Sequence, residues 1–541
     1  MRDTTGPLLD VDRLTVEFET DSGPFTAVNE ISFAVGRNES VAIIGESGSG
    51  KSVTANAVLG LIDCPPGRIR GGDIRFDGKS LFTMPEAQRR DIYGRRIAMV
   101  FQDPLTHLNP VRTIGWQVGE VCRIHGASRK EAEARSLELL DRVGIPQPKL
   151  RMRDYPHEFS GGQRQRIMIA MAIALRPEIL IADEPTTALD VTVQAQILDL
   201  LRDLRAEMGM SLLMITHDLG VAADIADRVL VMKKGEIVER GATETIFSTP
   251  QHPYTRQLLT DRSEEYRSKA PDQPEPLLEI SGLGIHYGAF HAVKNVSATL
   301  ARGEILGVVG ESGSGKSSLA AAVLRLREPS SGQVRYRGKD VTTLKGGDLK
   351  AYHRSVQAVF QDPFSSLNPR MTVLRILSEP WDLHPDVVPR AARPARAAEL
   401  LAMVGLERAD LARYPSEFSG GQRQRIAIAR ALALGPEVIV CDEAVSALDM
   451  TIQAQVITLL ADLRTKLGLS YIFIAHDLAL VQKFADRVLV MKNGEVVEEG
   501  VAETVFTNPS HPYTRQLIAS SPVPDPGEQA ERRAMRLLGA A

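Results

Sequence analysis

The sequence predicts an α/β fold that occurs twice in a chain of 541 residues. Short apolar segments alternate with amphipathic helical segments, as is typical of a largely parallel sheet covered by helices. An octapeptide at 45–52 recurs unchanged at 310–317, and from residue 102 onward the shared motifs of the two halves lie 259 residues apart. These repeats indicate two copies of one domain fused head to tail.

The domain bounds follow from the composition between the repeats. Residues 262–276 are charged, contain three prolines and show no helical or strand periodicity, so they predict an extended linker. We therefore expect a first domain at 1–261 and a second domain at 277–520. The remaining residues, 521–541, are expected to form a polar tail, to which the sequence assigns no role.

The composition argues against several classes of protein. Lys+Arg 64 against Asp+Glu 68 gives no sign of a nucleic-acid binder. Cys64, Cys122 and Cys441 lack ligand-like spacing, which favours a reducing compartment over a disulfide framework or a metal site. The longest apolar run, 167–175, is far shorter than the roughly 20 residues of a membrane span, and residues 1–6 lack the apolar core of a signal peptide. We expect a soluble, cytosolic protein that could dock on a membrane partner.

Each half is expected to combine an α/β core with a helical insert. Apolar residues at 197, 200, 201 and 204 predict a helix that ends near Gly209, whereas the region 103–175 contains helical patterns without strands. Ser128 and Glu131 form a capping-box pattern that opens one of those helices. The predicted buried strands are Val41–Ile44, Ile179–Ala182 and Leu212–Ile215, with Leu306–Val309, Val438–Cys441 and Tyr471–Ile474 in the repeat.

The repeated octapeptide matches the G-x-x-x-x-G-K-[ST] pattern between a strand and a helix, which predicts a cradle of backbone N–H groups around nucleotide phosphates. The lysines would reach the β- and γ-phosphates, and the following serines would bind Mg²⁺. One such match arises by chance in about 2% of chains of this length, so two identical copies exclude a coincidental turn. The predicted residues are Gly45, Glu46, Ser47, Gly48, Ser49, Gly50, Lys51, Ser52 and Val53, with Gly310, Glu311, Ser312, Gly313, Ser314, Gly315, Lys316, Ser317 and Ser318 in the repeat.

Asp183 and Asp442 each close a predicted strand and are followed by Glu184 and Glu443. At this edge of the sheet an aspartate can hold Mg²⁺ through its waters, and the adjacent glutamate can deprotonate the attacking water. The alternative is a pair of solvent-exposed acids at a strand end.

A histidine follows another buried strand in each half, 34 residues after the aspartate: His217 and His476. Alone, such a histidine is more often structural, but in this constellation we expect a contact to the γ-phosphate. Gln102 and Gln361 could bring an amide to Mg²⁺ or to the attacking water, although either would be uninformative alone.

A second motif that can bind an anion precedes an Arg- and Ala-rich helix in each half. It is Ser160, Gly161, Gly162 and Gln163, with Ser419, Gly420, Gly421 and Gln422 in the repeat. A Ser-Gly-Gly sequence at a helix start presents N–H groups to an anion. Because each half already has a phosphate loop, we expect each of these ends to close on the nucleotide that the other half holds.

These motifs together resemble the nucleotide-binding domain of ATP-binding cassette (ABC) transporters, twice and over nearly the whole chain. The resemblance includes the D-loops Ala188–Asp190 and Ala447–Asp449. It implies tandem P-loop NTPase domains, each with a RecA-like core, an antiparallel β subdomain and a helical insert. It also implies ATP and Mg²⁺ as cofactors, with one ATP between Lys51 and Ser419 and the other between Lys316 and Ser160.

In that family an aromatic residue stacks on adenine, and the best matches here are Phe18 and Tyr287, with Phe25 as a rival in the first half. The sequence departs from the family at Phe159 and Phe418, where Leu is usual, and at Ala444, where the first half has Pro185. No departure removes a charged or catalytic group, so both ATP sites are expected to be competent.

Local motifs resemble the peptide/nickel importer subfamily, in which two ATPase subunits serve a pair of permeases. They are 102–110, 361–369 and the His-Pro-Tyr-Thr-Arg-Gln-Leu elements at 252–258 and 511–517. The resemblance implies two integral-membrane permease subunits, an extracytoplasmic substrate-binding protein and a peripheral place on the cytoplasmic face of the bacterial plasma membrane. Dipeptides, longer peptides, glutathione, nickel chelates and haem all stay open as substrates. Because no cysteine follows Cys441, we expect no cysteine cluster near the second element.

If ATP drives import, the helical insert must contact the permeases. We expect apolar residues after Gln102 and Gln361, namely Leu105, Leu108, Phe364 and Leu367, to line grooves for permease helices; the alternative is that they pack the insert.

The competing class is a soluble tandem ABC ATPase that acts on ribosomes or DNA. The short linker, the balanced charge and the lack of zinc spacings argue against it, and the lack of a fused membrane domain argues against an exporter half.

Overall fold

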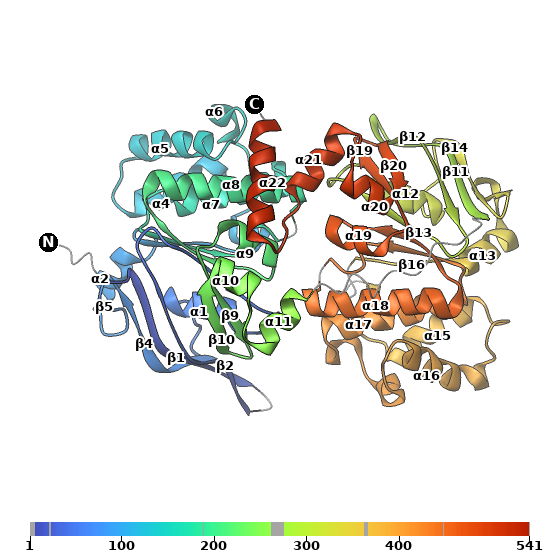
Figure 1. Cartoon of the computed structure of the whole chain (residues 1–541), viewed down its shortest axis with the longest axis horizontal. Coiled ribbons are helices and arrows are strands. Elements are labelled where there is room, and N and C mark those ends of the chain that lie inside the picture. Colours follow the sequence, from blue (N-terminus) through green and yellow to red (C-terminus); the bar gives the residue numbers. More distant parts are fainter. Residues whose placement is uncertain are drawn as a thin grey trace. The chain divides into compact units, whose positions relative to one another are not determined.

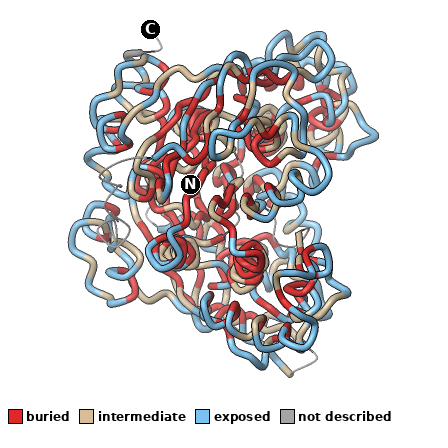
Figure 2. The backbone as a smooth tube through the Cα atoms, turned by 90° about the vertical axis from the view of Figure 1, so that its right-hand side faces the viewer, coloured by how far each residue is buried: buried red, intermediate tan, exposed pale blue. Residues whose placement is uncertain are grey.

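The computed structural model describes residues 6–20, 23–187, 189–260, 275–361, 366–446 and 448–539. The chain divides into two compact units, Met1–Thr260 with Pro522–Ala541, and Asp261–Ser521 (Figure 1). Buried residues, red in Figure 2, concentrate on the strands and on the inward faces of the helices. Residues 262–274 of the predicted linker, Phe364 and the first residue of each D-loop lie outside the described residues.

The larger sheet of unit 1 has the strand order β10-β9-β3-β8-β7-β6. All its pairings are parallel except that of β10 with β9. Every residue of β3, β7 and β8 is buried, because helices cover one face of the sheet and α1 with a second sheet covers the other, which is why these strands are continuous apolar runs. The predicted strands in this sheet are confirmed. Its strands are β3 Ser40–Ile44, β6 Ile97–Val100, β7 Ile179–Asp183, β8 Ser211–Ile215, β9 Arg228–Lys233 and β10 Glu236–Ala242.

A second, antiparallel sheet of unit 1 has the order β2-β1-β4-β5. Its inward side chains share one apolar core with α1 and with one face of the larger sheet. The antiparallel subdomain that the family resemblance implies is therefore present. Its strands are β1 Leu9–Thr20, β2 Gly23–Val35, β4 Gly67–Phe76 and β5 Lys79–Ser80.

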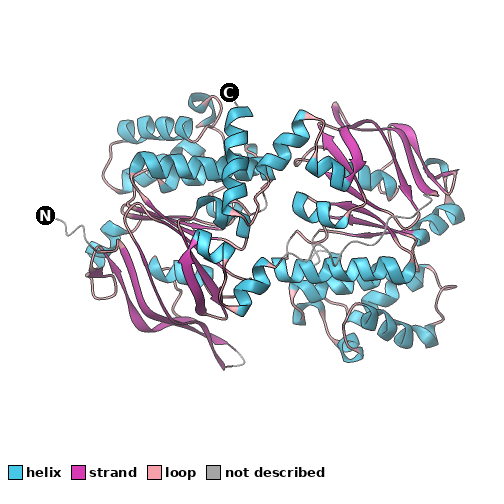
Figure 3. Cartoon of the chain, in the orientation of Figure 1, coloured by secondary structure: helices cyan, strands magenta, loops and turns pink. Residues whose placement is uncertain are grey.

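The segment between Gln102 and β7 is helical and contains no strand among its described residues (Figure 3). The capping box at Ser128 is present. The Ser128 side chain accepts a hydrogen bond from the Glu131 N–H, and the Glu131 side chain accepts one from the Ser128 N–H. Helix α8 ends at Gly209, whose φ of 63° stops the helix, as expected. The helices of unit 1 are α1 Lys51–Val58, α2 Glu86–Ile92, α3 Pro104–His107, α4 Ile114–Ile124, α5 Arg129–Arg142, α6 Pro148–Arg151, α7 Gly161–Ala172, α8 Val191–Met208, α9 Leu219–Ile225, α10 Thr243–Ser248, α11 Pro253–Leu259 and α22 Pro526–Gly539, with a 3₁₀ turn at Pro156–Glu158.

Unit 2 repeats this architecture, with sheet orders β16-β17-β18-β13-β19-β20 and β12-β11-β14-β15. Its strands are β11 Pro276–Tyr287, β12 Phe290–Ala301, β13 Ile305–Val309, β14 Ser331–Tyr336, β15 Lys339–Asp340, β16 Val356–Val359, β17 Val438–Asp442, β18 Ser470–Ile474, β19 Arg487–Lys492 and β20 Glu495–Val501. Its helices are α12 Lys316–Val323, α13 Gly346–Ser355, α15 Val373–Leu383, α16 Arg393–Met403, α17 Gly420–Leu432, α18 Met450–Leu467, α19 Leu478–Phe484, α20 Ala502–Thr507 and α21 Pro512–Ser520. The predicted fold class, two tandem domains with an α/β core, is confirmed.

The sequence predicts a polar C-terminal tail at 521–541 and assigns it no role. The tail contains α22, and residues from Pro522 onward belong to unit 1 rather than to unit 2.

Candidate functional site

The glycine-rich loop of unit 1 links β3 to α1, and its glycines are required by contacts on the loop's inner side. A Cβ at Gly45 would lie 2.2 Å from the Met232 carbonyl oxygen, and one at Gly50 would lie 2.5 Å from that of Ala27. Gly310 and Gly315 are equally confined, because a Cβ there would lie 2.2 and 2.3 Å from the nearest backbone carbonyl oxygen. The loop therefore follows a path that no larger residue could take, and its N–H groups precede the N-terminus of α1.

The lysine of each loop is buried and lies over the loop. Lys51 Nζ donates to the carbonyl oxygens of Gly45 (2.7 Å) and Glu46 (2.8 Å), and Lys316 makes the equivalent contacts at 2.7 and 2.9 Å. The hydroxyl of Ser49 is buried without a hydrogen-bond partner among the described residues, as is that of Ser314. A buried ammonium beside an unsatisfied hydroxyl and a turn of N–H groups suits an anion such as a nucleotide phosphate.

An acid and a hydroxyl meet beside each loop. Ser52 Oγ donates to Asp183 Oδ1 (3.1 Å), and Ser317 Oγ donates to Asp442 Oδ1 (3.2 Å). Burial raises the pKa of Asp183 to about 6 and also raises the pKa of Asp442. A carboxylate that burial destabilises in its charged form gains from a nearby divalent cation, and hard oxygen ligands are those Mg²⁺ prefers. These residues therefore suit Mg²⁺, which would neutralise phosphate charge.

Glu184 lies at the centre of a polar network in unit 1. Its Oε2 accepts from Gln102 Nε2 (2.7 Å) and Thr187 Oγ1 (3.1 Å), and its Oε1 lies 2.9 Å from His217 Nδ1. The structure thus brings together three residues, Gln102, Glu184 and His217, that belong to separate motifs of the sequence. The φ of Glu184 is 46°, an uncommon backbone conformation for a residue other than glycine.

Charge in this network is arranged to keep the glutamate ionised. Burial disfavours the Glu184 carboxylate, but the hydrogen bond and charge of His217 outweigh burial and lower its pKa. The hydrogen bond to Glu184 in turn raises the pKa of His217. An ionised carboxylate held in one orientation can accept a proton from a water molecule.

The second half has the same parts in a looser arrangement. Glu443 has a φ of 49°, but His476 Nδ1 lies 3.9 Å from Glu443 Oε2, beyond hydrogen-bond distance. Gln361 is described and exposed, and it directly precedes residues outside the described range. The two candidate sites therefore differ in how closely the histidine and the glutamate pair.

The Ser-Gly-Gly motifs form the starts of α7 and α17. Ser160 and Gln163 cap α7 reciprocally, and Ser419 and Gln422 do the same for α17. The second glycine also has a packing role, because a Cβ at Gly162 would lie 2.4 Å from Val193 on α8 and one at Gly421 would lie 2.3 Å from Ile452. The role of these motifs at a nucleotide stays a prediction.

The predicted adenine-stacking residues differ in their surroundings. Phe18 is partly buried and packs on the core of unit 1, next to Gly67. Tyr287 is 43% exposed with the Arg327 guanidinium 4.3 Å from its ring centre, and Phe25 is 56% exposed. The stacking role of these residues stays a prediction.

Sequence reasoning missed the function of the His-Pro-Tyr elements, whose tyrosines reach the phosphate loops. The Glu46 N–H donates to Tyr254 Oη at 3.2 Å, and the Glu311 N–H donates to Tyr513 Oη at the same distance. Both tyrosines are 3% exposed, and Lys233 Nζ lies 4.3 Å from the Tyr254 ring centre. Each element thus supports its phosphate loop through a tyrosine hydroxyl. No pattern in the sequence indicates this contact.

Changing both tyrosines to phenylalanine should raise the KM for ATP about two- to tenfold while kcat changes little, because a loop N–H loses its acceptor. Steady-state kinetics of Tyr254→Phe/Tyr513→Phe checks this, with Tyr155→Phe at a 40%-exposed position as the control. An unchanged KM for ATP would show that the hydroxyl does not position the loop.

The prediction that Leu108 and Leu367 line a groove is wrong. They are only 2% and 1% exposed, and Leu108 belongs to the apolar core of unit 1. Leu105 is 65% exposed, whereas Phe364 lies outside the described residues. The packing interpretation holds for the two buried leucines.

No helix within the described residues is both long enough and apolar enough to span a membrane. The family model of the ABC transporter matches residues 28–187 and 293–446, and that of the oligopeptide/dipeptide transporter C-terminal region matches 238–276 and 497–538. Both His-Pro-Tyr elements and all of α22 except its last residue lie within the latter matches.

Two similar proteins are the glutathione import ATP-binding proteins GsiA of Salmonella typhimurium and Escherichia coli K12. Each is 46% identical, and the alignment covers 98% of this chain and 92% of the relative. The solved post-hydrolysis dimer of the ATP-binding cassette MJ0796, bound to ADP and Pi, is 30% identical over 42% of this chain and 99% of its own, with a TM-score of 0.39.

The alternative of an ATPase that acts on ribosomes or DNA is not supported by these relatives. The chain belongs to the ABC transporter family, as a tandem ATP-binding protein that hydrolyses ATP and carries the oligopeptide/dipeptide transporter C-terminal region in both halves.

Proposed function

We propose that this chain powers an importer of small peptides from the cytoplasmic face of a bacterial plasma membrane. The observation that carries the proposal is the combination of a phosphate loop and a buried acid with the oligopeptide/dipeptide region in each half. Two permease subunits would form the channel, and an extracytoplasmic binding protein would deliver the substrate. The similarity to glutathione import proteins favours substrates of about the size of a di- or tripeptide.

In this proposal the halves close head to tail around two ATP molecules. Lys51 and the loop N–H groups of the first half hold one triphosphate, and Ser419 of the second half completes that site. Lys316 and Ser160 form the other site in the same way.

In each site the loop serine, the buried aspartate and Gln102 or Gln361 would hold Mg²⁺, which would neutralise phosphate charge. Glu184 and Glu443 accept the proton of the attacking water, and His217 and His476 contact the γ-phosphate.

Reconstitution tests this function directly. The chain is purified with the permease subunits that co-purify with it, and vesicles are loaded with the binding protein and labelled glutathione or dipeptide. ATP added outside should move the label outward and raise hydrolysis severalfold over vesicles without peptide. Glu184→Gln/Glu443→Gln complexes serve as the hydrolysis-deficient control. A chain that does not associate with the permeases, or whose hydrolysis and transport ignore every peptide tested, would contradict the proposal.

A further inference from the structure

A segment from the far end of the chain completes the first unit. Unit 2 ends at Ser521, and the next residue, Pro522, already belongs to unit 1. Helix α22 then lies against α9 and α10 of unit 1, and it is the red helix beside α9 in Figure 1. The second half is thus bound to the first not only through residues 261–274 but also through its own C-terminal helix.

The first part of the docking site is a close backbone contact at α9. A Cβ at Gly220 would lie 2.6 Å from the main-chain carbon of Pro522 and 2.7 Å from the Val523 nitrogen, so the tail passes directly over this glycine. The Val523 N–H donates to Gln529 Oε1 at 3.0 Å, and Gln529 is 1% exposed. The turn before α22 is therefore fixed both to α9 and to α22 itself.

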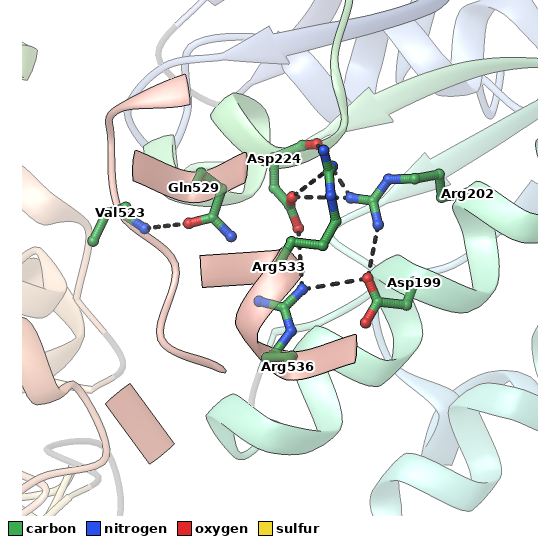
Figure 4. A network of polar contacts seen from close by, with 7 residues as sticks. All are labelled: Asp199, Arg202, Asp224, Val523, Gln529, Arg533 and Arg536. Carbon is green, nitrogen blue, oxygen red and sulfur yellow. Dashed lines mark hydrogen bonds and ion pairs between the residues drawn. The ribbon is translucent and has the colours of Figure 1, made fainter. Parts of the chain in front are cut away.

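The second part is a cluster of five charges (Figure 4). Arg533 Nη1 on α22 donates to Asp224 Oδ1 (3.3 Å), and Arg536 Nη2 donates to Asp199 Oδ1 (3.3 Å). Arg202 joins both acids, at 2.7 Å from Asp199 Oδ1 and 2.9 Å from Asp224 Oδ1. The Asp224 side chain is 1% exposed, so its charge depends on these arginines for compensation.

The repeat provides an internal comparison, because the equivalent positions lie 259 residues later. Gly220 corresponds to Ala479, and the Cβ of an alanine at this position would collide with a backbone segment that passes as Pro522 does. Asp224 corresponds to Lys483, which would repel Arg533. Asp199 and Arg202 correspond to Thr458 and Ala461. The docking site is thus encoded in the first half alone, although the two halves share their catalytic motifs.

We propose that α22 is an intramolecular clasp. It is an arginine-bearing helix at the end of the second half, and it binds a dedicated docking site on the first half. This binding keeps the halves joined when no nucleotide is bound. The clasp acts by raising the effective concentration of one half near the other, as a second attachment beside the covalent linker. It contacts α9, which begins two residues after His217.

Cleaving the linker tests the clasp in the full chain. A protease site is inserted between Glu264 and Glu265, the protein is cut to completion without ATP, and association of the two fragments is measured by sedimentation. The wild-type fragments should stay together. Arg533→Glu/Arg536→Glu should raise the apparent Kd between the fragments at least about 30-fold, as expected when buried charge pairs are replaced by like charges.

The control variant is Arg90→Glu/Arg396→Glu, which makes the same change of charge at two exposed ion pairs, with Glu86 on α2 and Glu399 on α16. It should leave the fragments associated. Adding Asp199→Arg/Asp224→Arg to the α22 variant keeps three cations and two acids in the cluster and should restore association.

Hydrogen exchange on the uncut proteins separates loss of docking from loss of folding. In the α22 variant, amides of α9 should exchange at least about tenfold faster, while those of the equivalent helix α19 stay unchanged. Wild-type fragments that separate after cutting, or variant fragments that bind as tightly as wild type, would overturn the clasp. Neither result depends on the transported substrate, so failure here is distinct from failure of the proposed import function.

Discussion

Glu184→Gln and Glu443→Gln are each expected to slow hydrolysis at the altered site by about 10²–10⁴-fold while sparing ATP binding. Glutamine keeps the shape of the side chain and can still face Gln102 and His217, but it cannot accept the proton of the attacking water. The lowered pKa of Glu184 keeps the carboxylate ionised in the wild type, so the charge is present when it is needed.

Single-turnover hydrolysis and equilibrium binding of a labelled ATP separate the two effects. Glu86→Gln makes the same chemical change at a solvent-exposed acid of α2 and should alter neither quantity. Normal steady-state turnover in Glu184→Gln/Glu443→Gln would refute the assignment of these residues as general bases.

Much of the fold could be predicted because its elements carry local signals. Strands such as β7 and β8 are apolar at nearly every position, because parallel strands at the centre of a sheet are buried on both faces. Helix α8 ends where Gly209 takes a left-handed conformation, and α5 begins at a reciprocal cap. Asp183, Glu184 and His217 share this property, since they close or follow strands that the sequence marks.

Other features depend on contacts between distant segments, which no local pattern specifies. Tyr254 reaches a loop 208 residues earlier, so only the folded topology shows that it supports the phosphate site. Arginines on α22 have a clear helical arrangement, but their acids lie more than 300 residues away. Leu108 shows the converse, because an apolar residue in a loop gives no sign of whether it faces inward or outward.

The second large effect concerns the lysines of the loops. Lys316→Ala removes a buried ammonium from its phosphate site and should reduce hydrolysis there by about 10²–10³-fold, as for other preorganised donors to a developing charge. In the crossed arrangement Lys316 and Ser160 serve the same nucleotide, whereas Lys316 and Ser419 serve different ones.

A double-mutant cycle with nucleotide counting tests that arrangement most directly. Lys316→Ala/Ser160→Ala should be little worse than Lys316→Ala alone and should still bind one ATP per chain. Lys316→Ala/Ser419→Ala should damage both sites and bind less than one. Two results together would contradict the claim that each triphosphate is shared between opposite halves. The losses of Lys316→Ala and Ser160→Ala would add in full, and Lys316→Ala/Ser419→Ala would leave one site intact.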